Sequence, residues 1–251
     1  MSSYAHYPSL RGKSVFITGG ASGIGATMVG HFVAQGARVG YIDVDDAAAA
    51  ALAEQLPGSA TYRHCDVRDI AALQQAIAAF EGENGHVDVL VNNVGDDERH
   101  QVDEVDLAYW DNRMAINLRP QFFAAQAVRK GMGQAGGGSI INLGSIVVQM
   151  GSIETVAYVA AKAAVYGLTR SLAREFGPQR IRVNCLVPGW VMTERQIQLW
   201  LDEAGERRLA ERQCIPDRLV PEDIARMALF LAADDSRHCT AQNFIVDGGW
   251  V

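Results

Sequence analysis

The stretch TGGASGIG, residues 18–25, decides the fold. It follows an apolar run of strand length at 14–18 and opens a stretch of helical period at 24–35. Its glycines permit a tight turn and let a ligand approach the backbone, and the free N–H groups at the helix start can face a diphosphate. The turn glycines in question are Gly19, Gly23 and Gly25. A glycine-rich turn alone is weak evidence for a nucleotide site, so the next strand matters.

That next strand, 38–43, ends in the carboxylate of Asp43, which lies about 20 residues beyond the glycines. A carboxylate at this place can accept hydrogen bonds from both hydroxyls of an adenosine ribose. A 2′-phosphate would meet like charge there, and neither Ser22 nor Val44 offers a basic side chain. The sequence therefore favours NAD over NADP. The alternative for Asp43 on its own is a turn residue at a strand end.

Apolar runs of strand length alternate with stretches of helical period along the whole chain, which is typical of βαβ units. The pattern predicts seven strands, at 14–18, 38–43, 60–66, 87–93, 139–145, 181–187 and 243–248. It predicts helices at 24–35, 46–56, 69–84, 104–130, 156–176 and 221–233, with Gly36 and Gly177 as C-terminal stops. Segment 190–218 also favours helix but lies outside the alternation. We expect one α/β domain over 1–251, with a parallel sheet covered by helices on both faces.

Composition excludes several classes of function. The net charge of −7, without a block of basic residues, provides no field for nucleic acid or anionic lipid. No stretch approaches the ~20 apolar residues that span a bilayer, and the first residues lack a signal core, so a cytoplasmic location is expected. The four cysteines form no C-x-x-C pair and the six histidines are scattered, so we predict neither a disulfide framework nor a metal site.

The helical run AYVAAKAAVYG, residues 157–167, holds one of only three lysines in the chain. Tyr158 and Lys162 stand four positions apart, so they share one helix face. An ammonium close to a phenol lowers the pKa of the phenol, which would make Tyr158 a usable proton acceptor or donor. The alternative is a lysine that extends to solvent from a half-exposed helix.

Two further polar residues lie near the predicted ligand edge. Ser145 ends the strand that precedes the tyrosine helix, at the carboxyl edge where open α/β sheets place their ligands, and its hydroxyl could hold a substrate oxygen. Asn117 lies inside a helical run, where an amide is a mediocre helix former. For Asn117 alone, a solvated helix position is the simpler interpretation.

Together these residues resemble the short-chain dehydrogenases/reductases over essentially the whole chain. The resemblance rests on TGGASGIG, Asp66 in CDV, NNVG at 92–95, Asn117, GS at 144–145, YVAAK at 158–162, PG at 188–189 and VDGGW at 246–250. It implies a Rossmann fold and hydride transfer to a nicotinamide. It further implies Tyr158 as general base or acid, Ser145 as the group that orients the substrate, Lys162 as the group that lowers the pKa of Tyr158 and binds ribose, and Asn117 as the holder of a relay water.

The same resemblance implies a cofactor site at the carboxyl edge of the sheet. Its residues would be Gly19, Ser22, Gly23, Ile24 and Gly25 near the diphosphate, Asp43 at the ribose, Asp66 and Val67 at the adenine, Asn93 beneath the adenosine, and Pro188, Gly189, Val191 and Thr193 at the nicotinamide.

A narrower resemblance, to bacterial NAD-dependent aldose 1-dehydrogenases, rests on GDDERH (95–100), INLRPQFFAAQAV (116–128), GGGSIINLGSI (136–146), AERQC (210–214) and DRLVPEDIARMALFLAADDSR (217–237). It implies oxidation of D-xylose, L-arabinose or D-galactose at the anomeric carbon to the lactone. The chain departs from the broader family pattern at Val94, and from the narrower one at Pro120 and in VVQMG after Ser145. Polar groups that could meet sugar hydroxyls are Asp97, Arg99, His100, Gln149, Trp190 and Gln196, with 190–218 covering the substrate.

Two alternatives stay open. The enzyme could oxidise another secondary alcohol, such as a polyol, a hydroxy acid or a 3-hydroxyacyl compound. The fold could also serve a non-catalytic NAD(H)-binding regulator, because fold does not fix function. The family resemblance implies a homotetramer.

Overall fold

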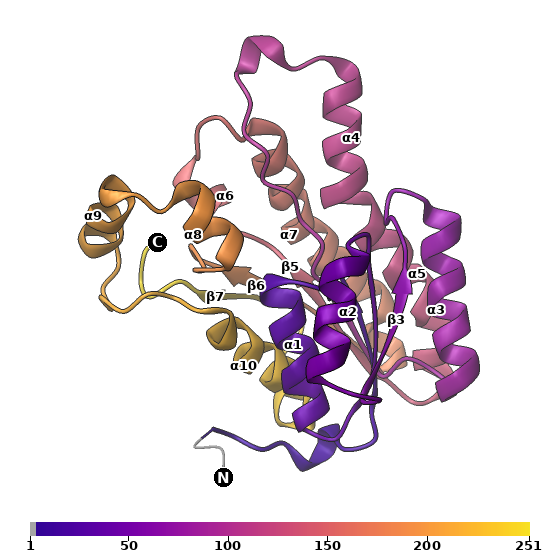
Figure 1. Cartoon of the computed structure of the whole chain (residues 1–251). Helices are drawn as coiled ribbons and strands as arrows, with labels where there is room; N and C mark the ends of the chain where they lie inside the picture. The colour runs from indigo at the N-terminus through magenta and orange to yellow at the C-terminus, as the bar shows by residue number, and fades with distance from the viewer. Residues whose placement is uncertain (1–3) are drawn as a thin grey trace.

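Seven parallel strands form one sheet in the computed structural model, which describes residues 4–251 (Figure 1). The strand order is β3-β2-β1-β4-β5-β6-β7, which confirms the predicted parallel sheet. The order reverses between β1 and β4, so the carboxyl ends of these two strands open a crevice at the switch point. The strands are β1 (Ser14–Thr18), β2 (Arg38–Asp43), β3 (Ala60–His64), β4 (Val89–Asn92), β5 (Gly138–Leu143), β6 (Ile181–Pro188) and β7 (Asn243–Val246).

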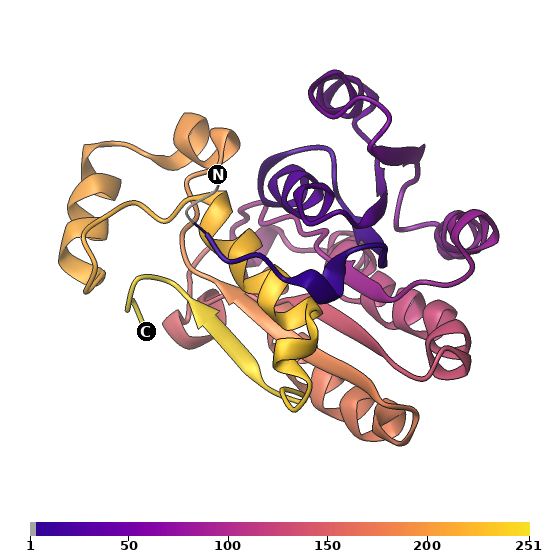
Figure 2. The same ribbon diagram turned by 90° about the horizontal axis from the view of Figure 1, so that it is seen from below.

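Helices cover both faces of the sheet, as the view from below shows (Figure 2). One face carries α1 (Gly23–Ala34), α2 (Asp46–Gln55) and α10 (Pro221–Ala232). The other carries α3 (Ile70–Asn84), α5 (Arg119–Gln134) and α7 (Val156–Phe176), with α4 (Leu107–Asn117) packed on α5 and α7. Short helices are α6 (Val147–Met150) and the 3-10 turns Pro8–Leu10, Val102–Glu104, Gly177–Gln179 and Asp234–Ser236.

Strand β1 shows how the two cores arise, because successive side chains point to opposite faces. Val15 and Ile17 belong to the core cluster with α1 and α10. Phe16 points the other way and packs on Phe80 of α3, with ring centroids 5.5 Å apart. All five residues of the strand are buried, as expected for a parallel strand that is covered on both sides.

The predicted single helix over 104–130 is wrong. Asp106 caps α4, which ends at Asn117, and Leu118 leaves helical geometry at φ −125° before α5 begins. Pro120 explains the break, because in a continuous helix it would have no N–H to donate to the carbonyl of Ile116 and its ring would clash with that carbonyl. The break leaves Asn117 at a helix end beneath the ligand edge of the sheet.

Several predicted ends differ from those of the structure, whereas Gly36 is confirmed as a helix stop. Gly36 takes a left-handed φ of +79° directly after α1, whereas Gly177 stays right-handed at −53°. A 3-10 turn follows Gly177, and Arg180 makes the left-handed step instead, at φ 59°. The third strand stops at His64, before Asp66, so that Asp66 lies in the loop at the carboxyl edge.

Segment 190–218 forms a separate excursion between β6 and α10. It contains α8 (Glu194–Trp200) and α9 (Glu203–Arg212), and the side chains of Thr193 and Asp202 cap their N-termini. The excursion lies beside the carboxyl edge of the sheet (Figure 1). Among residues 4–251, no helix combines the length and the apolar character needed to cross a membrane.

Candidate active site

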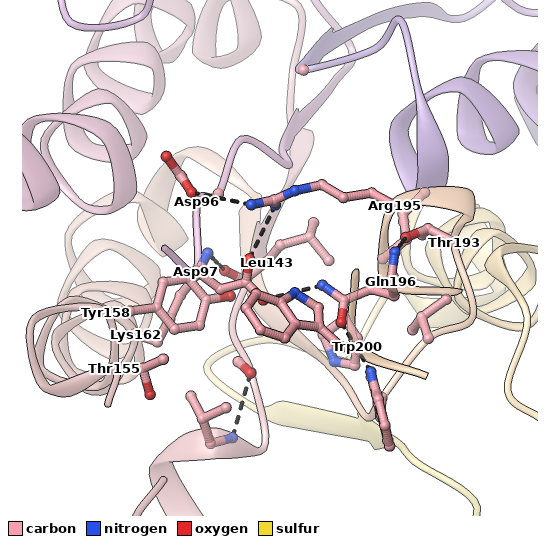
Figure 3. A pocket seen from close by; sticks show the side chains of 18 of the residues that line it. Asp96, Asp97, Leu143, Thr155, Tyr158, Lys162, Thr193, Arg195, Gln196 and Trp200 are labelled. Carbon is pink, nitrogen blue, oxygen red and sulfur yellow. Dashed lines mark hydrogen bonds and ion pairs between the residues drawn. The ribbon is translucent and has the colours of Figure 1, made fainter. Parts of the chain in front are cut away.

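A cavity of about 980 Å³ runs along the carboxyl edge of the sheet (Figure 3). It extends from Gly19 and Asp43 at the ends of β1 and β2 to Ser145 and Tyr158, and α8 covers one side of it. It is long enough to join the predicted nucleotide turn to the predicted catalytic residues. The same space can therefore hold a dinucleotide and a small substrate end to end.

The glycine turn is shaped for close approach by a ligand. Gly19 and Gly23 have positive φ, +67° and +53°, which favours glycine at both places. A Cβ on Gly25 would lie 1.8 Å from the carbonyl oxygen of Gly19, so no side chain fits there. Asn93 fixes the turn, because its Nδ2 donates to the Gly19 oxygen at 2.7 Å. The turn and the start of α1 fit the diphosphate of a dinucleotide.

Backbone amides hold Asp43 at the cavity wall. Its Oδ2 accepts a hydrogen bond from the N–H of Ala21 at 3.0 Å, and its Oδ1 accepts one from the N–H of Val44 at 2.8 Å. Ser22 and Val44 line the cavity beside it. The carboxylate thus faces the place that a ribose would occupy, next to neutral side chains.

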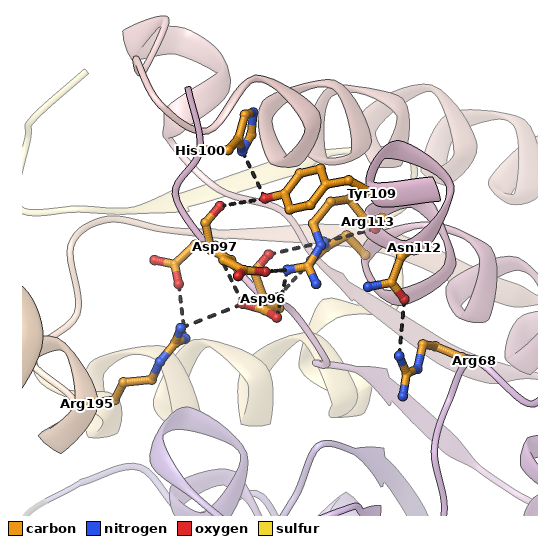
Figure 4. Close-up of polar contacts among 10 residues, drawn as sticks. Arg68, Asp96, Asp97, His100, Tyr109, Asn112, Arg113 and Arg195 are labelled. Atoms are coloured by element: carbon orange, nitrogen blue, oxygen red, sulfur yellow. Dashed lines mark hydrogen bonds and ion pairs between the residues drawn. The ribbon is translucent and has the colours of Figure 1, made fainter. Parts of the chain in front are cut away.

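Asp66 and Val67 line the outer end of the cavity, as predicted for an adenine pocket. Arg68, which the sequence analysis missed, binds Asp66 with Nε and Nη2 at 2.6–3.0 Å. Hydrogen bonds from this guanidinium lower the pKa of Asp66. Arg68 also donates a hydrogen bond to Asn112 of α4 (Figure 4).

The inner end of the cavity gathers three of the four predicted catalytic residues. Ser145 follows β5 and forms a hydrogen bond with the Tyr158 side chain, and both line the cavity. Lys162 is 1% exposed, and its ammonium donates to the Leu143 carbonyl at 2.9 Å. The lysine therefore points into the protein toward the site (Figure 3), and the alternative of a solvent-extended lysine is wrong.

Asn117 lies behind the cavity wall. Its Oδ1 accepts a hydrogen bond from the backbone N–H of Asp96 at 2.8 Å, and its Nδ2 donates to the oxygens of Arg113 and Asp96. The side chain is fully buried, which rules out the solvated helix position. It clamps the loop after β4 against the end of α4.

The pKa of Tyr158 moves in the direction opposite to the one expected. Burial raises it above the usual tyrosine value, the nearby Asp97 charge raises it further, and the hydrogen bond with Ser145 opposes this rise. The Nζ of Lys162 lies 5.4 Å from the centroid of the Tyr158 ring. Burial in turn lowers the pKa of Lys162 from 10.5 to about 8.

The residues predicted for the nicotinamide also line the cavity: Pro188, Gly189, Val191 and Thr193. Gly189 needs to be glycine, because a Cβ would lie 2.7 Å from the Cα of Asp247. Thr193 accepts a hydrogen bond from the N–H of Gln196 as the cap of α8, which places its side chain where β6 passes into the covering segment.

Four of the six predicted substrate residues line the cavity, namely Asp97, Arg99, Trp190 and Gln196. The other two predictions are wrong in placement. His100 is buried against Tyr109, with a hydrogen bond of 3.0 Å to its hydroxyl (Figure 4), and Gln149 accepts a hydrogen bond from Tyr166 outside this cavity. His100 lies on the loop after β4 and Gln149 on the short helix α6, and neighbouring elements set the direction of both side chains.

An ionic cluster on the cavity wall was not predicted from the sequence; it is formed by Asp96, Arg113 and Arg195 together with Asp97. Arg195 and Asp97 are 98 positions apart, so no local pattern signals the pair. Among residues 4–251, no group of three His, Cys, Asp or Glu side chains is arranged to hold a metal ion.

A dinucleotide turn, a carboxylate at the ribose and a Ser–Tyr–Lys set share one cavity on a seven-stranded parallel sheet. Residues 19–251 match the family described as "Enoyl-(Acyl carrier protein) reductase". The chain belongs to the short-chain dehydrogenase/reductase family, and it is an oxidoreductase of the kind that uses a nicotinamide cofactor.

Particular relatives are closely similar over their full length. The chain is 47% identical to the D-xylose 1-dehydrogenase of Caulobacter vibrioides, over 99% of both proteins. It is 43% identical to the "Probable galactose dehydrogenase GalD" of Rhizobium meliloti, over 98% of this chain and 97% of the relative. Its fold matches that of a blue fluorescent protein from a metagenomic library, solved in complex with NADPH, with a TM-score of 0.88, 34% identity and coverage of 97% and 99%.

Proposed function

We propose that this protein oxidises a free aldose at its C1 hydroxyl, passing the hydride to NAD and releasing the lactone. The observation that carries the proposal is the single cavity that joins Asp43 to Tyr158. The similarity to a D-xylose 1-dehydrogenase and a galactose dehydrogenase supports a sugar as the substrate. Asp97, Trp190 and Gln196 would supply polar groups and an aromatic face at the inner end.

The chain's own residues would position the sugar and move its proton. Ser145 would hold the C1 oxygen, and Tyr158 would take the hydroxyl proton as general base. NAD supplies the hydride acceptor when it is bound. Lys162 would bind the nicotinamide ribose and support the tyrosinate with its charge, and Asn117 would hold the loop after β4 and a water of the proton relay.

We propose NAD and not NADP as the cofactor because of Asp43. Its carboxylate is fixed at the cavity wall by the N–H groups of Ala21 and Val44. A 2′-phosphate placed there would meet this charge, and the exposed Val44 offers no cation to receive it.

The test is a panel of free aldoses, polyols, hydroxy acids and secondary alcohols with NAD or NADP, followed by the absorbance of the reduced nicotinamide. We expect turnover with an aldose and NAD, with Tyr158→Phe inactive on the same sugar. Turnover with only a polyol or a hydroxy acid would keep the catalytic residues and refute the sugar proposal. Binding of NAD without turnover on any compound would favour a regulator.

We propose a homotetramer in the cytoplasm, built from single-domain subunits. Large apolar side chains are exposed on and near α4 and before α7, such as Val102, Leu107 and Ile153, at 66–80% exposure. Light scattering after gel filtration should give about 108 kDa, four times the 27.1 kDa of one chain. A mass of one chain would refute the assembly.

A further inference from the structure

Arg195, on the covering helix α8, reaches two acidic residues of the loop after β4 (Figure 4). Its Nη1 lies 3.0 Å from Oδ1 of Asp97, and its Nη2 lies 3.6 Å from Oδ1 of Asp96. The neighbouring Gln196 donates to the second oxygen of Asp97 at 3.1 Å. Both oxygens of the Asp97 carboxylate are thus bound by α8.

We propose that Arg195 is a positioning residue: by binding Asp97 and Asp96 it holds α8 over the cavity and balances the Asp97 charge beside Tyr158. This inference rests on the proposed function for its kinetic test. It also revises the role expected for Asp97. Both of its carboxylate oxygens accept hydrogen bonds from α8, so we no longer expect Asp97 to bind a sugar hydroxyl directly.

The acidic loop is a firm anchor for such a contact. Arg113 of α4 is buried and binds the other oxygen of Asp96 at 2.8 Å. Asn117 holds the backbone of Asp96 on both its N–H and its oxygen. Arg113 and Asn117 thus hold three atoms of Asp96, so the loop offers Arg195 a fixed partner.

Helix α8 has few other ties. In the part of the chain that the structure describes, none of its residues belongs to a hydrophobic core cluster. Another contact with the loop lies at its C-terminal end, where the Arg99 guanidinium stacks 3.7 Å over the Trp200 ring. The ionic contacts of Arg195 therefore secure the N-terminal end of α8, next to Thr193.

The charged and titratable groups that face Tyr158 come from three elements, and a fourth element supplies a partner to one of them. Asp96 and Asp97 approach from the loop after β4, Arg195 from α8 and Lys162 from α7 itself, while Arg113 of α4 faces Asp96. The aspartates raise the pKa of Tyr158 and Arg195 lowers it. Opposite charges at one site predict opposite effects when each is removed.

The experiment compares Arg195→Met, Asp97→Asn and the double variant, with Arg207→Met as the matched control. Arg207 lies on α9 and pairs with Glu203, so its loss removes one charge from the same segment without touching the loop. We expect Arg195→Met to raise the pH midpoint of turnover by about half a unit and KM for the sugar by about 3-fold. Asp97→Asn should lower the midpoint, and the double variant should lie between the two.

Hydrogen exchange of residues 194–200 gives a second readout that needs no substrate. Exchange should be faster in Arg195→Met than in the wild type and in Arg207→Met. Unchanged exchange, or midpoints of the two single variants that move in the same direction, would overturn the inference. If the wild type turns over no aldose, the proposed function fails, while the exchange comparison still decides whether Arg195 holds α8.

Discussion

The ammonium of Lys162 lies inside the protein, where only the Leu143 carbonyl accepts its hydrogen bond among the contacts described for it. Such burial is costly for a charge. The pKa of Lys162 falls from 10.5 to about 8, so an unfolded chain binds its proton more tightly than the folded one. Below pH 8 the group is charged in both states and the full cost applies. Above 10.5 it is neutral in both states and the cost vanishes.

Lys162→Met should therefore stabilise the fold while removing turnover. We expect a free energy of unfolding higher by roughly 1–3 kcal/mol at pH 7, because a pKa change of one unit corresponds to about 1.4 kcal/mol and the Leu143 carbonyl loses its donor. The gain should shrink as the pH rises from 8 to 10.5. Urea unfolding of both proteins at pH 7 and pH 10 measures it, and an equal difference at both values would contradict the burial argument.

Tyr158→Phe separates chemistry from folding. The substitution removes only the hydroxyl, so we expect turnover to fall by about 10²–10⁴-fold with an almost unchanged Tm. Steady-state kinetics and a thermal scan measure both. Tyr7→Phe is the matched control. The backbone N–H of Tyr7 donates to Gln35 at the C-terminal end of α1, and the cavity lies at the N-terminal end of that helix. Substantial turnover in Tyr158→Phe would mean that another group takes the proton.

The β1–turn–α1 unit provides a test at the scale of an element. A Cβ on Gly25 would lie 1.8 Å from the Gly19 oxygen, whereas a Cβ on Gly30 of the same helix would have no neighbour within 4 Å. Gly25→Ala should distort the turn and abolish NAD binding. Gly30→Ala should keep binding and stabilise α1 by about 0.5–1 kcal/mol. Calorimetric titration with NAD distinguishes the two, and normal binding by Gly25→Ala would refute the close-packed turn.

The elements that were predicted well from the sequence are those whose conformation is determined by residues close together in the chain. The seven strands and the turn at Gly19 follow from apolar periodicity and glycine placement, which neighbouring residues determine. The helix break at Leu118 also has a local cause, Pro120. The helical period of the residues on both sides of this proline nevertheless favoured a single continuous helix. The contact of Arg195 with Asp97 joins α8 to the loop after β4. Because these segments are far apart in the sequence, they meet only when the chain is folded. The placements of His100 and Gln149 failed for the same reason.

We expect the whole chain to unfold in a single transition, because one sheet separates and contacts both of its large hydrophobic cores. Cofactor binding should therefore raise the Tm of the entire domain. Ligand binding to the folded state alone adds about 2.7 kcal/mol at 100 times Kd. For a chain of this size we expect NAD at that level to raise Tm by roughly 5–10 °C in a single transition. NADP at the same concentration should raise it less, owing to Asp43. A scanning calorimeter measures both, and an equal rise with NADP would refute the proposed preference.

The position of α8 and α9 has a consequence for how such a protein can change over generations. Within residues 4–251, neither helix contributes a residue to the core clusters, and both are inserted between β6 and α10 at one edge of the sheet. Mutations there alter what the cavity accepts at little cost to folding, because the buried sheet is untouched. A duplicated gene could thus acquire a new substrate by drift in this one excursion, while the nucleotide turn and the tyrosine helix stay under unchanged selection.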